Sequence, residues 1–341
     1  MRPSSFLPTV LLACVSLVGC DQIIEALTNR AESMVQSGFE PSPDGQLGMK
    51  LDAYIGCINN ASMGVRRSAN RYFDWVDPEK GPTGEEKVVF GLFAVNDQSA
   101  CIDAVARVAE TEPRDAELEA AGAEFVQTLQ TAIALVDEAH KYYDQKDYKD
   151  DGFAKGKELH PKLVSAFDAF GAADKKLRAI VVVQNDALLA RELDRIEKEL
   201  GQKLRWHQAK VMAVAKHLVE VTEAGIDHGK LVLDASTFEP SLKEFEEAFE
   251  ALQAYTKANK AETDSVTLFS SFTSAGVEFL KAGKEMLRRH RDGTAFSDTE
   301  IERLSSWPEQ VEGNPIKFMK KYDDLVMNSN RLNWHFYKPN G

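Results

Sequence analysis

The chain has 341 residues, and 54 aspartates and glutamates against 41 lysines and arginines give it a net charge of −13 at neutral pH. This acidic balance excludes general binding to nucleic acid and a polybasic attachment to anionic lipid. Hydrophobic residues make up 43% of the chain, which is enough to bury a core, whereas four cysteines are too few for a disulfide scaffold.

The first 19 residues have the organisation of a bacterial secretory signal. Arg2 is followed by an apolar run from Phe6 to Val18, which is shorter than the ~20 residues that a membrane span needs. The run ends in Leu17-Val18-Gly19-Cys20, which resembles a lipobox. We therefore predict that residues 1–19 are cleaved and that Cys20 carries the acyl chains, palmitate among them, of a lipoprotein. The alternative is an ordinary cleaved signal with a chance Gly-Cys at its end.

Asp21 directly follows the predicted lipid-bearing cysteine. In enteric bacteria an aspartate here resembles the sorting signal that keeps lipoproteins in the inner membrane. We expect a lipid anchor on the periplasmic face of the inner membrane. The outer membrane is the alternative, because the sorting rule depends on the bacterial lineage.

Two cysteines, Cys57 and Cys101, remain once Cys14 is removed with the signal and Cys20 is lipidated. One leftover pair in an exported domain predicts a disulfide. It would close a loop of about 45 residues. The crosslink would lower the entropy of the unfolded chain and so stabilise the fold by roughly 3–4 kcal/mol. The alternative is two buried free thiols, and a metal site is disfavoured because neither cysteine has a Cys or His at ligand spacing.

Residues 20–45 are interpreted as the lipidated N-terminus and a tether, because residues 40–45 are rich in Pro, Ser and Gly. From there helical periodicity dominates, and β-forming residues gather only at 87–94 and 179–183. We expect helices over the following ranges: 54–75, 100–108, 115–143, a segment opened by Pro240, a segment from Leu268 to Met286, a short helix with a capping box at Ser297 and Glu300, and 316–332.

The longest helical pattern lies between His160 and Gly225. Its apolar positions are mostly three or four residues apart, as in a coiled coil, and they keep their phase through Gly201. This pattern predicts one very long helix or two nearly collinear ones, on the order of 100 Å in length. The fold class is therefore expected to be all-α, an elongated helical bundle forming a single domain over residues 46–341.

The segment between residues 142 and 160 places Asp147, Asp151, Gly152 and Glu158 at positions 1, 5, 6 and 12 of a calcium-binding loop. Lys149, however, puts an ammonium where position 3 needs a ligand oxygen. The simpler interpretation is a polar turn between two long helices, with tyrosines packed across it. We expect no cofactor and keep calcium, held by the three acids, as the alternative.

Two histidines, His140 and His160, flank this segment and could meet if the turn closes a hairpin. With Tyr143 and Tyr148 they form a candidate ligand or partner site, and with neighbouring acids a candidate metal or acid–base cluster. The sequence contains no GxSxG, SxxK, Walker or HExxH motif, so we assign no catalytic residue. His207 lies on the apolar stripe and is expected to be a packed core histidine.

Several stretches resemble one family. The longest is residues 142–160 (YYDQKDYKDDGFAKGKELH), supported by residues 54–59 (YIGCIN), 71–77 (RYFDWVD), 81–84 (GPTG), 322–325 (YDDL) and 330–332 (NRL). These residues resemble the YiiG-like bacterial lipoproteins of unknown function. The resemblance implies a helical periplasmic lipoprotein and no assigned reaction.

The sequence as a whole favours a lipid-anchored, non-enzymatic binding or structural module of the cell envelope. Its expected partners are the membrane, through the lipid, and an envelope protein, with no nucleic acid. The alternative is a metal-dependent or hydrolytic activity centred on the segment from Tyr142 to His160.

Overall fold

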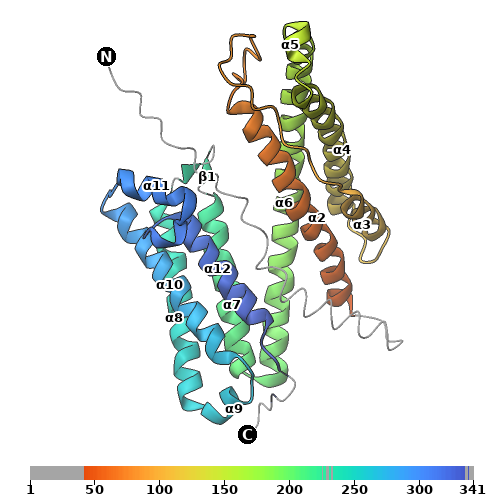
Figure 1. The fold of residues 1–341 in the computed structure, drawn as a ribbon. Helices are drawn as coiled ribbons and strands as arrows, with labels where there is room; N and C mark the ends of the chain where they lie inside the picture. The colour runs from red at the N-terminus through yellow and green to blue at the C-terminus, as the bar shows by residue number, and fades with distance from the viewer. Residues whose placement is uncertain (1–41, 225, 228–229, 232, 335–336, 338–341) are drawn as a thin grey trace. The chain divides into compact units, whose positions relative to one another are not determined.

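The computed structural model describes residues 42–224, 226–227, 230–231, 233–334 and 337. These residues are helical over most of their length, which confirms the all-α class (Figure 1). Two strands of two residues each, β1 (Ile226–Asp227) and β2 (Lys230–Leu231), form an antiparallel pair. The predicted signal, Cys20 and Asp21 lie outside the described residues.

The chain divides into two compact units, and the boundary falls between Leu188 and Leu189. We call the described residues before this boundary the N-terminal unit and those after it the C-terminal unit. Helix α6 (Ala154–Leu200) crosses the boundary. The single domain expected over residues 46–341 spans both units.

The N-terminal unit packs three long helices around an aromatic and aliphatic core. Its other elements are α2 (Pro43–Phe73), α3 (Ser99–Ala109), α4 (Ala116–Asp144) and α5 (Tyr148–Asp151). Tyr54 of α2, Phe125 of α4 and Phe170 of α6 are each at most 1% exposed, and the two phenyl ring centroids are 5.3 Å apart. These helices hold the segment that the sequence singled out, residues 142–160.

Helix α2 begins earlier than the sequence suggested. Ser42 is its N-cap, and the Ser42 side chain accepts a hydrogen bond from the Gly45 backbone at 3.2 Å. Pro43 occupies the first helical turn, where a missing N–H costs nothing. Residues 43–45, expected in the tether, therefore form the first turn of α2.

Residues 74–98, which connect α2 to α3, form no strand apart from an isolated bridge between Asp77 and Gly81. The β-forming residues 87–94 lie in this connection, and residues 179–183 are part of α6. β-Branched composition alone therefore does not produce a strand where no neighbouring strand is available.

Helix α6 is 47 residues long, but the helical stripe does not continue through Gly201, so the prediction that residues 160–225 form one very long helix or two nearly collinear ones is wrong in that respect. Helix α6 ends at Leu200, Gly201 adopts a left-handed φ of +73°, and α7 (Leu204–Ala224) runs in the opposite direction (Figure 1). Glycine accepts this conformation without steric cost. The apolar residues of α7 then pack against α8 (Ala235–Ala258), which preserves their burial without a continuous helix.

The C-terminal unit is a helical bundle with a phenylalanine-rich core. Its further elements are α9 (Lys260–Asp264), α10 (Phe269–Arg291), α11 (Asp298–Ser306), the 3₁₀-helix η2 (Pro308–Gln310) and α12 (Pro315–Asn330). Phe245, Phe279 and Phe318 are fully buried, and the rings of Phe279 and Phe318 stack at 4.8 Å. The predicted capping box between Ser297 and Glu300 is present at the start of α11.

None of the helices of the described residues combines the length and the apolar character needed to cross a bilayer.

Candidate functional site

The segment from Tyr142 to His160 connects α4 to α6 through a tight reversal. Lys146, Gly152 and Phe153 have positive φ values of 62°, 62° and 67°, and the short α5 lies between the first of them and the other two. Asp151 Oδ2 accepts a hydrogen bond from the Lys155 backbone at 2.9 Å, and Asp151 Oδ1 accepts one from the Tyr142 hydroxyl at 2.8 Å. These bonds fix the beginning of α6 against the end of α4.

Five aromatic side chains gather beneath this reversal and form what we call the Tyr72–His160 cluster. Its members are Tyr72, Trp75, Tyr142, Tyr143 and His160. The rings of Trp75 and Tyr143 meet edge to face at 5.1 Å, and those of Tyr142 and Tyr143 at 4.9 Å. Burial raises the pKa of the Tyr72 and Tyr143 hydroxyls far above the ordinary phenol value, so both stay neutral.

His160 uses both ring nitrogens within the protein. Its Nε2 lies 3.1 Å from the carbonyl oxygen of Pro78, which can only accept, so Nε2 carries the proton. Its Nδ1 lies 3.0 Å from the Tyr72 hydroxyl and, in the neutral ring, accepts from it. With 7% of its surface exposed, His160 is a structural histidine that joins α6 to the connection after α2.

Two glycines leave the space that the rings of His160 and Tyr143 occupy. Gly81 has a φ of +73°, and a Cβ there would lie 2.8 Å from His160 Cδ2. A Cβ at Gly156 would lie 2.8 Å from the Tyr143 hydroxyl. The Gly81-Pro82-Thr83-Gly84 turn, named above for its resemblance to a family, therefore packs directly on the predicted histidine.

The three acids considered for calcium do not converge. Asp147 precedes α5, Asp151 bonds Tyr142 and Lys155, and Glu158 pairs with Lys162 at 2.7 Å. Within the described ranges, no group of three or more His, Cys, Asp or Glu side chains could hold a metal ion. The calcium loop is replaced by the helical turn α5, because residues 148–151 hydrogen-bond as a helix.

Of the other residues of the candidate site, His140 does not bond to His160. His140 lies half-buried on α4, and both nitrogens of His160 face other groups. The rings of Tyr148 and Phe153 are tilted by 40° with their centroids 4.9 Å apart, and the Tyr148 ring also lies 6.1 Å from that of Tyr143. The structure thus joins Tyr143, Tyr148 and His160 to one aromatic core, and the hairpin does not pair the two histidines.

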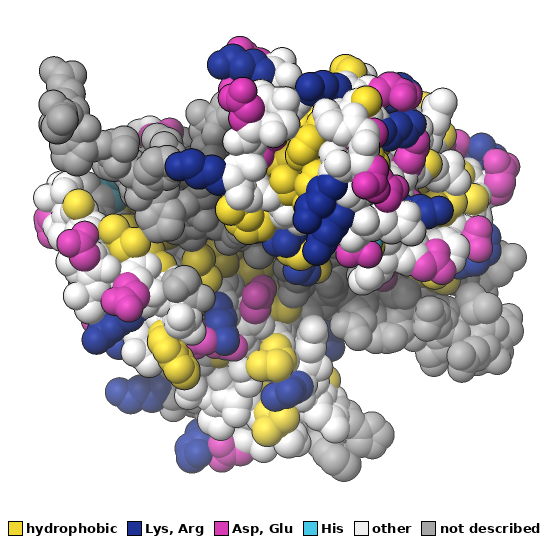
Figure 2. Space-filling view, turned by 45° about the horizontal axis from the view of Figure 1, so that its top comes forward, with side chains coloured by type: hydrophobic (Ala, Val, Ile, Leu, Met, Phe, Trp, Pro, Cys, Tyr) yellow, Lys and Arg dark blue, Asp and Glu magenta, His cyan; other side chains and the backbone are white. Residues whose placement is uncertain are grey.

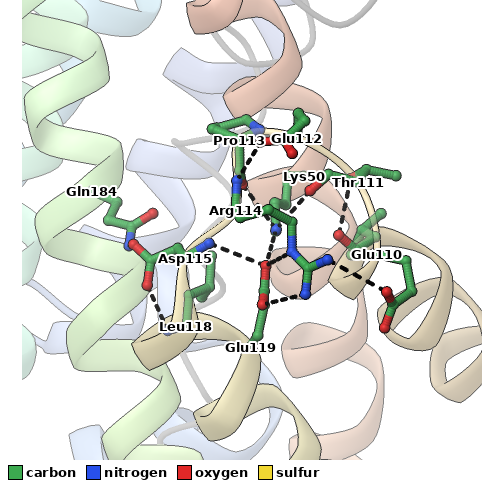
Figure 3. A network of polar contacts seen from close by, with 11 residues as sticks. Lys50, Glu110, Thr111, Glu112, Pro113, Arg114, Asp115, Leu118, Glu119 and Gln184 are labelled. Carbon is green, nitrogen blue, oxygen red and sulfur yellow. Dashed lines mark hydrogen bonds and ion pairs between the residues drawn. The ribbon is translucent and has the colours of Figure 1, made fainter.

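A polar network that the sequence analysis missed joins α2 to the connection between α3 and α4 (Figure 3). Lys50 Nζ donates to the carbonyls of Thr111 and Pro113, at 3.1 and 3.0 Å, and to Glu119 Oε1 at 2.7 Å. Arg114 binds both oxygens of Glu119, at 2.9 and 3.0 Å. The sequence did hold a signal, because Lys50 stands four residues before Tyr54 and therefore on the apolar face of its helix.

A second buried charge lies on α6. The carboxylate of Asp174 is fully buried and accepts from the Ser62 hydroxyl at 2.6 Å and from Arg178 Nε at 3.0 Å. Arg66 of α2 pairs with its other oxygen. Two guanidiniums and a hydroxyl compensate this carboxylate, so the group ties α2 to α6.

The predicted disulfide is present between Cys57 of α2 and Cys101 of α3, whose Cα atoms are 4.7 Å apart. Together with Lys50, it fastens the α3–α4 connection to α2.

In the C-terminal unit, His207 is half-buried, and its ring centroid lies 4.8 Å from that of Tyr255. Desolvation lowers the pKa of His207, as expected for a packed histidine. An open groove of about 360 Å³ runs between α10 and α12, lined by Ser270, Ser274 and Asn328 among others.

These features define a class: a disulfide-bonded, all-α protein whose singled-out histidine and tyrosines are packed into a core. The chain belongs to the family described as Protein of unknown function (DUF3829), whose model matches residues 46–331. It is similar to the Uncharacterized protein YiiG of Escherichia coli (strain K12), with 29% identity over 317 residues that cover 90% of this chain and 86% of that protein. The YiiG-like resemblance is thereby confirmed, and no solved structure matches the chain.

Proposed function

We propose that the protein is a lipoprotein anchored through Cys20 on the periplasmic face of a bacterial membrane, where its helices act as a non-enzymatic binding or structural module. The observation that carries this proposal is the distribution of the four cysteines. Leu17-Val18-Gly19-Cys20 ends a short apolar run, and Cys57 and Cys101 form a disulfide. Disulfides persist in exported proteins and are rare in reducing compartments, which supports export of this chain.

The burial of His160 and the hydrogen bonds at both of its ring nitrogens support a non-enzymatic role. Catalysis by the central segment would need an imidazole or carboxylate free to reach a substrate. His160 is buried and bonded at both nitrogens, while Asp151 is engaged by Tyr142 and by the Lys155 backbone. The alternative, a metal-dependent or hydrolytic activity between Tyr142 and His160, has no favouring observation.

The test of the anchor is metabolic labelling of the full chain in a bacterial host with an alkyne analogue of palmitate. We expect label in the wild type and none in Cys20→Ser. Cys14→Ser is the matched control, because Cys14 lies in the segment that is removed, and it should keep the label. A wild type that is secreted without label would refute lipidation and favour the ordinary cleaved signal.

The sorting part of the proposal is tested separately, in an enteric host. We expect the wild type in inner-membrane fractions of a density gradient and Asp21→Ser in outer-membrane fractions. Identical fractions for both proteins would show that Asp21 does not direct sorting.

Calcium titration of the purified protein tests the rival activity. We expect an unchanged thermal midpoint. A rise with calcium that Asp151→Asn abolishes would instead support a metal site in the central segment.

A further inference from the structure

Three apolar side chains of the connection between α2 and α3 face solvent rather than the core. Val88, Phe90 and Phe93 are 53%, 48% and 40% exposed. Three large apolar side chains exposed within six residues are unusual on a protein surface, and such clusters mark contact surfaces.

Two arginines of α2 stand beside these rings. The Arg67 guanidinium lies 5.3 Å from the centre of the Phe93 ring, and that of Arg71 lies 4.4 Å from the same ring and 5.4 Å from that of Phe90. Neither arginine makes an ion pair with any carboxylate of the described residues. We call Arg67, Arg71, Val88, Phe90 and Phe93 the aromatic–arginine patch. Figure 2 shows that hydrophobic, basic and acidic side chains are interspersed on the visible face of the described residues.

The backbone beneath the patch is fixed. Arg71 Nε donates to the Phe90 carbonyl at 3.0 Å, and Trp75 Nε1 donates to the Gly91 carbonyl at 3.0 Å. Gly91 is buried, and a Cβ there would lie 3.1 Å from Tyr143 Cβ. The Tyr72–His160 cluster therefore supports a rigid connection that presents its phenyl rings outward.

The charge of the patch is positive in a chain that is otherwise acidic. Of the charged residues that precede Val88 in the chain, Lys87 and Glu85 are exposed and offset each other, and Glu86 is turned back to accept hydrogen bonds from the Thr83 and Gly84 backbones. Guanidiniums without acidic partners are suited to phosphate oxygens, which they bind in bidentate geometry.

We propose that the aromatic–arginine patch docks on the phospholipid surface in which Cys20 is anchored. Phe90 and Phe93 would enter the boundary between headgroups and acyl chains, while Arg67 and Arg71 bind lipid phosphates. The proposal rests on the lipid anchor of the proposed function.

The length of the tether permits this contact. Twenty-two residues separate Cys20 from Pro43, and they reach at most roughly 75 Å when fully extended. From Pro43 to Arg71 helix α2 rises about 42 Å. The anchor can therefore lie at the level of the patch, and tethering makes the docking step intramolecular, so that a weak contact is sufficient.

The size of the patch favours a lipid surface over a protein partner. A stable protein interface buries about 800 Å² on each side and involves about 20–30 residues. The patch has five residues, far fewer than such an interface. Its two phenyl rings, one isopropyl group and two guanidiniums match the composition of interfacial membrane anchors.

The test uses the full chain in bacteria grown with [³²P]phosphate, with the photoreactive p-benzoylphenylalanine in place of Phe90 or Phe93. The matched control places the same residue at Val183, which is 68% exposed on α6 of the same unit. After illumination we expect ³²P-lipid on the protein at both patch positions, at least about fivefold above the control. The diacylglycerol on Cys20 contains no phosphate, so it adds no background.

Two outcomes would overturn the docking proposal: equal ³²P at positions 90 and 183, or crosslinks from position 90 to another protein instead of lipid. The double variant Arg67→Ala/Arg71→Ala should lower the lipid crosslink at position 90 while keeping the wild-type unfolding midpoint. Palmitate labelling of the same samples reports the anchor independently. Labelled protein without a lipid crosslink refutes only the docking, whereas unlabelled protein refutes the anchor.

Discussion

Lys50 Nζ lies 2.7 Å from Glu119 Oε1, and no part of the lysine side chain is exposed. The two backbone carbonyls of Thr111 and Pro113 take the remaining donors of the ammonium, so its three N–H groups are all bonded. A buried ammonium is tolerated only with such compensation. Together with the Cys57–Cys101 disulfide, the three hydrogen bonds of Lys50 hold the chain between α3 and α4 against α2.

Replacement of Lys50 by methionine should therefore be costly. Lys50→Met keeps the volume but removes the donor to the carbonyls of Thr111 and Pro113, and Glu119 keeps only Arg114 and the Asp115 backbone N–H. We expect the free energy of unfolding to fall by about 3 kcal/mol, measured by urea denaturation. Lys80→Met is the control, because Lys80 is 75% exposed and 3.8 Å from Asp77, and it should change stability by less than about 0.5 kcal/mol. A loss in Lys50→Met no larger than in the control would contradict the structural role.

The same network makes stability depend on pH. Hydrogen bonds from Arg114, then Lys50, lower the pKa of Glu119 from 4.5 to about 2. A carboxyl with a lowered folded-state pKa stabilises the protein above its unfolded pKa, and this stabilisation disappears as the pH falls through the folded value. The wild type should therefore exceed Glu119→Gln in unfolding free energy at neutral pH, with the difference shrinking between about pH 4.5 and pH 2. A difference that is the same at both ends of this range would exclude the linkage.

The helical class could be predicted from sequence because apolar spacing is a local property that packing preserves. The reversal of chain direction at Gly201 could not be predicted in this way. A glycine inside a helical pattern costs only about 1 kcal/mol, so the pattern is compatible with a continuous helix and with a turn. The turn is favoured by contacts that are distant in sequence: α7 packs against α8, and Glu262 Oε1 accepts a hydrogen bond from the Leu204 backbone at 3.2 Å. That contact joins residues 58 positions apart, and local periodicity contains no information about it.

The candidate site was only partly predictable for a related reason. The importance of residues 142–160 was visible, since aromatic residues and glycines gather there. Their role was not, because the partners of His160 are Tyr72 and Pro78, 88 and 82 residues earlier in the chain. The conformation of the segment with three acids in a calcium-like order was not predictable either, because the order of the acids does not determine whether residues 148–151 form a loop or a helical turn.

The disulfide between Cys57 and Cys101 should contribute most through the unfolded chain. It joins residues 44 positions apart, and the chain-entropy relation gives roughly 3–4 kcal/mol for a loop of this length. We expect Cys57→Ser/Cys101→Ser to lose about this much unfolding free energy in urea. Dithiothreitol should destabilise the wild type and leave the double variant unchanged. If the reductant affects both proteins alike, the bond is not the cause.

Two helical glycines offer a matched pair that tests the packing of the N-terminal unit. Gly171 on α6 has no atom within 4 Å of an added Cβ, so Gly171→Ala should raise the unfolding free energy by about 0.5–1 kcal/mol through helix propensity. Gly122 on α4 instead faces the ring of Tyr54, which is fully buried and cannot move aside. The same substitution, Gly122→Ala, should lower the unfolding free energy by about 1–3 kcal/mol because it overpacks the core. Thermal and urea midpoints of the two variants should move in opposite directions. Gains in both would mean that α2 and α4 do not approach as closely as the Gly122–Tyr54 contact requires.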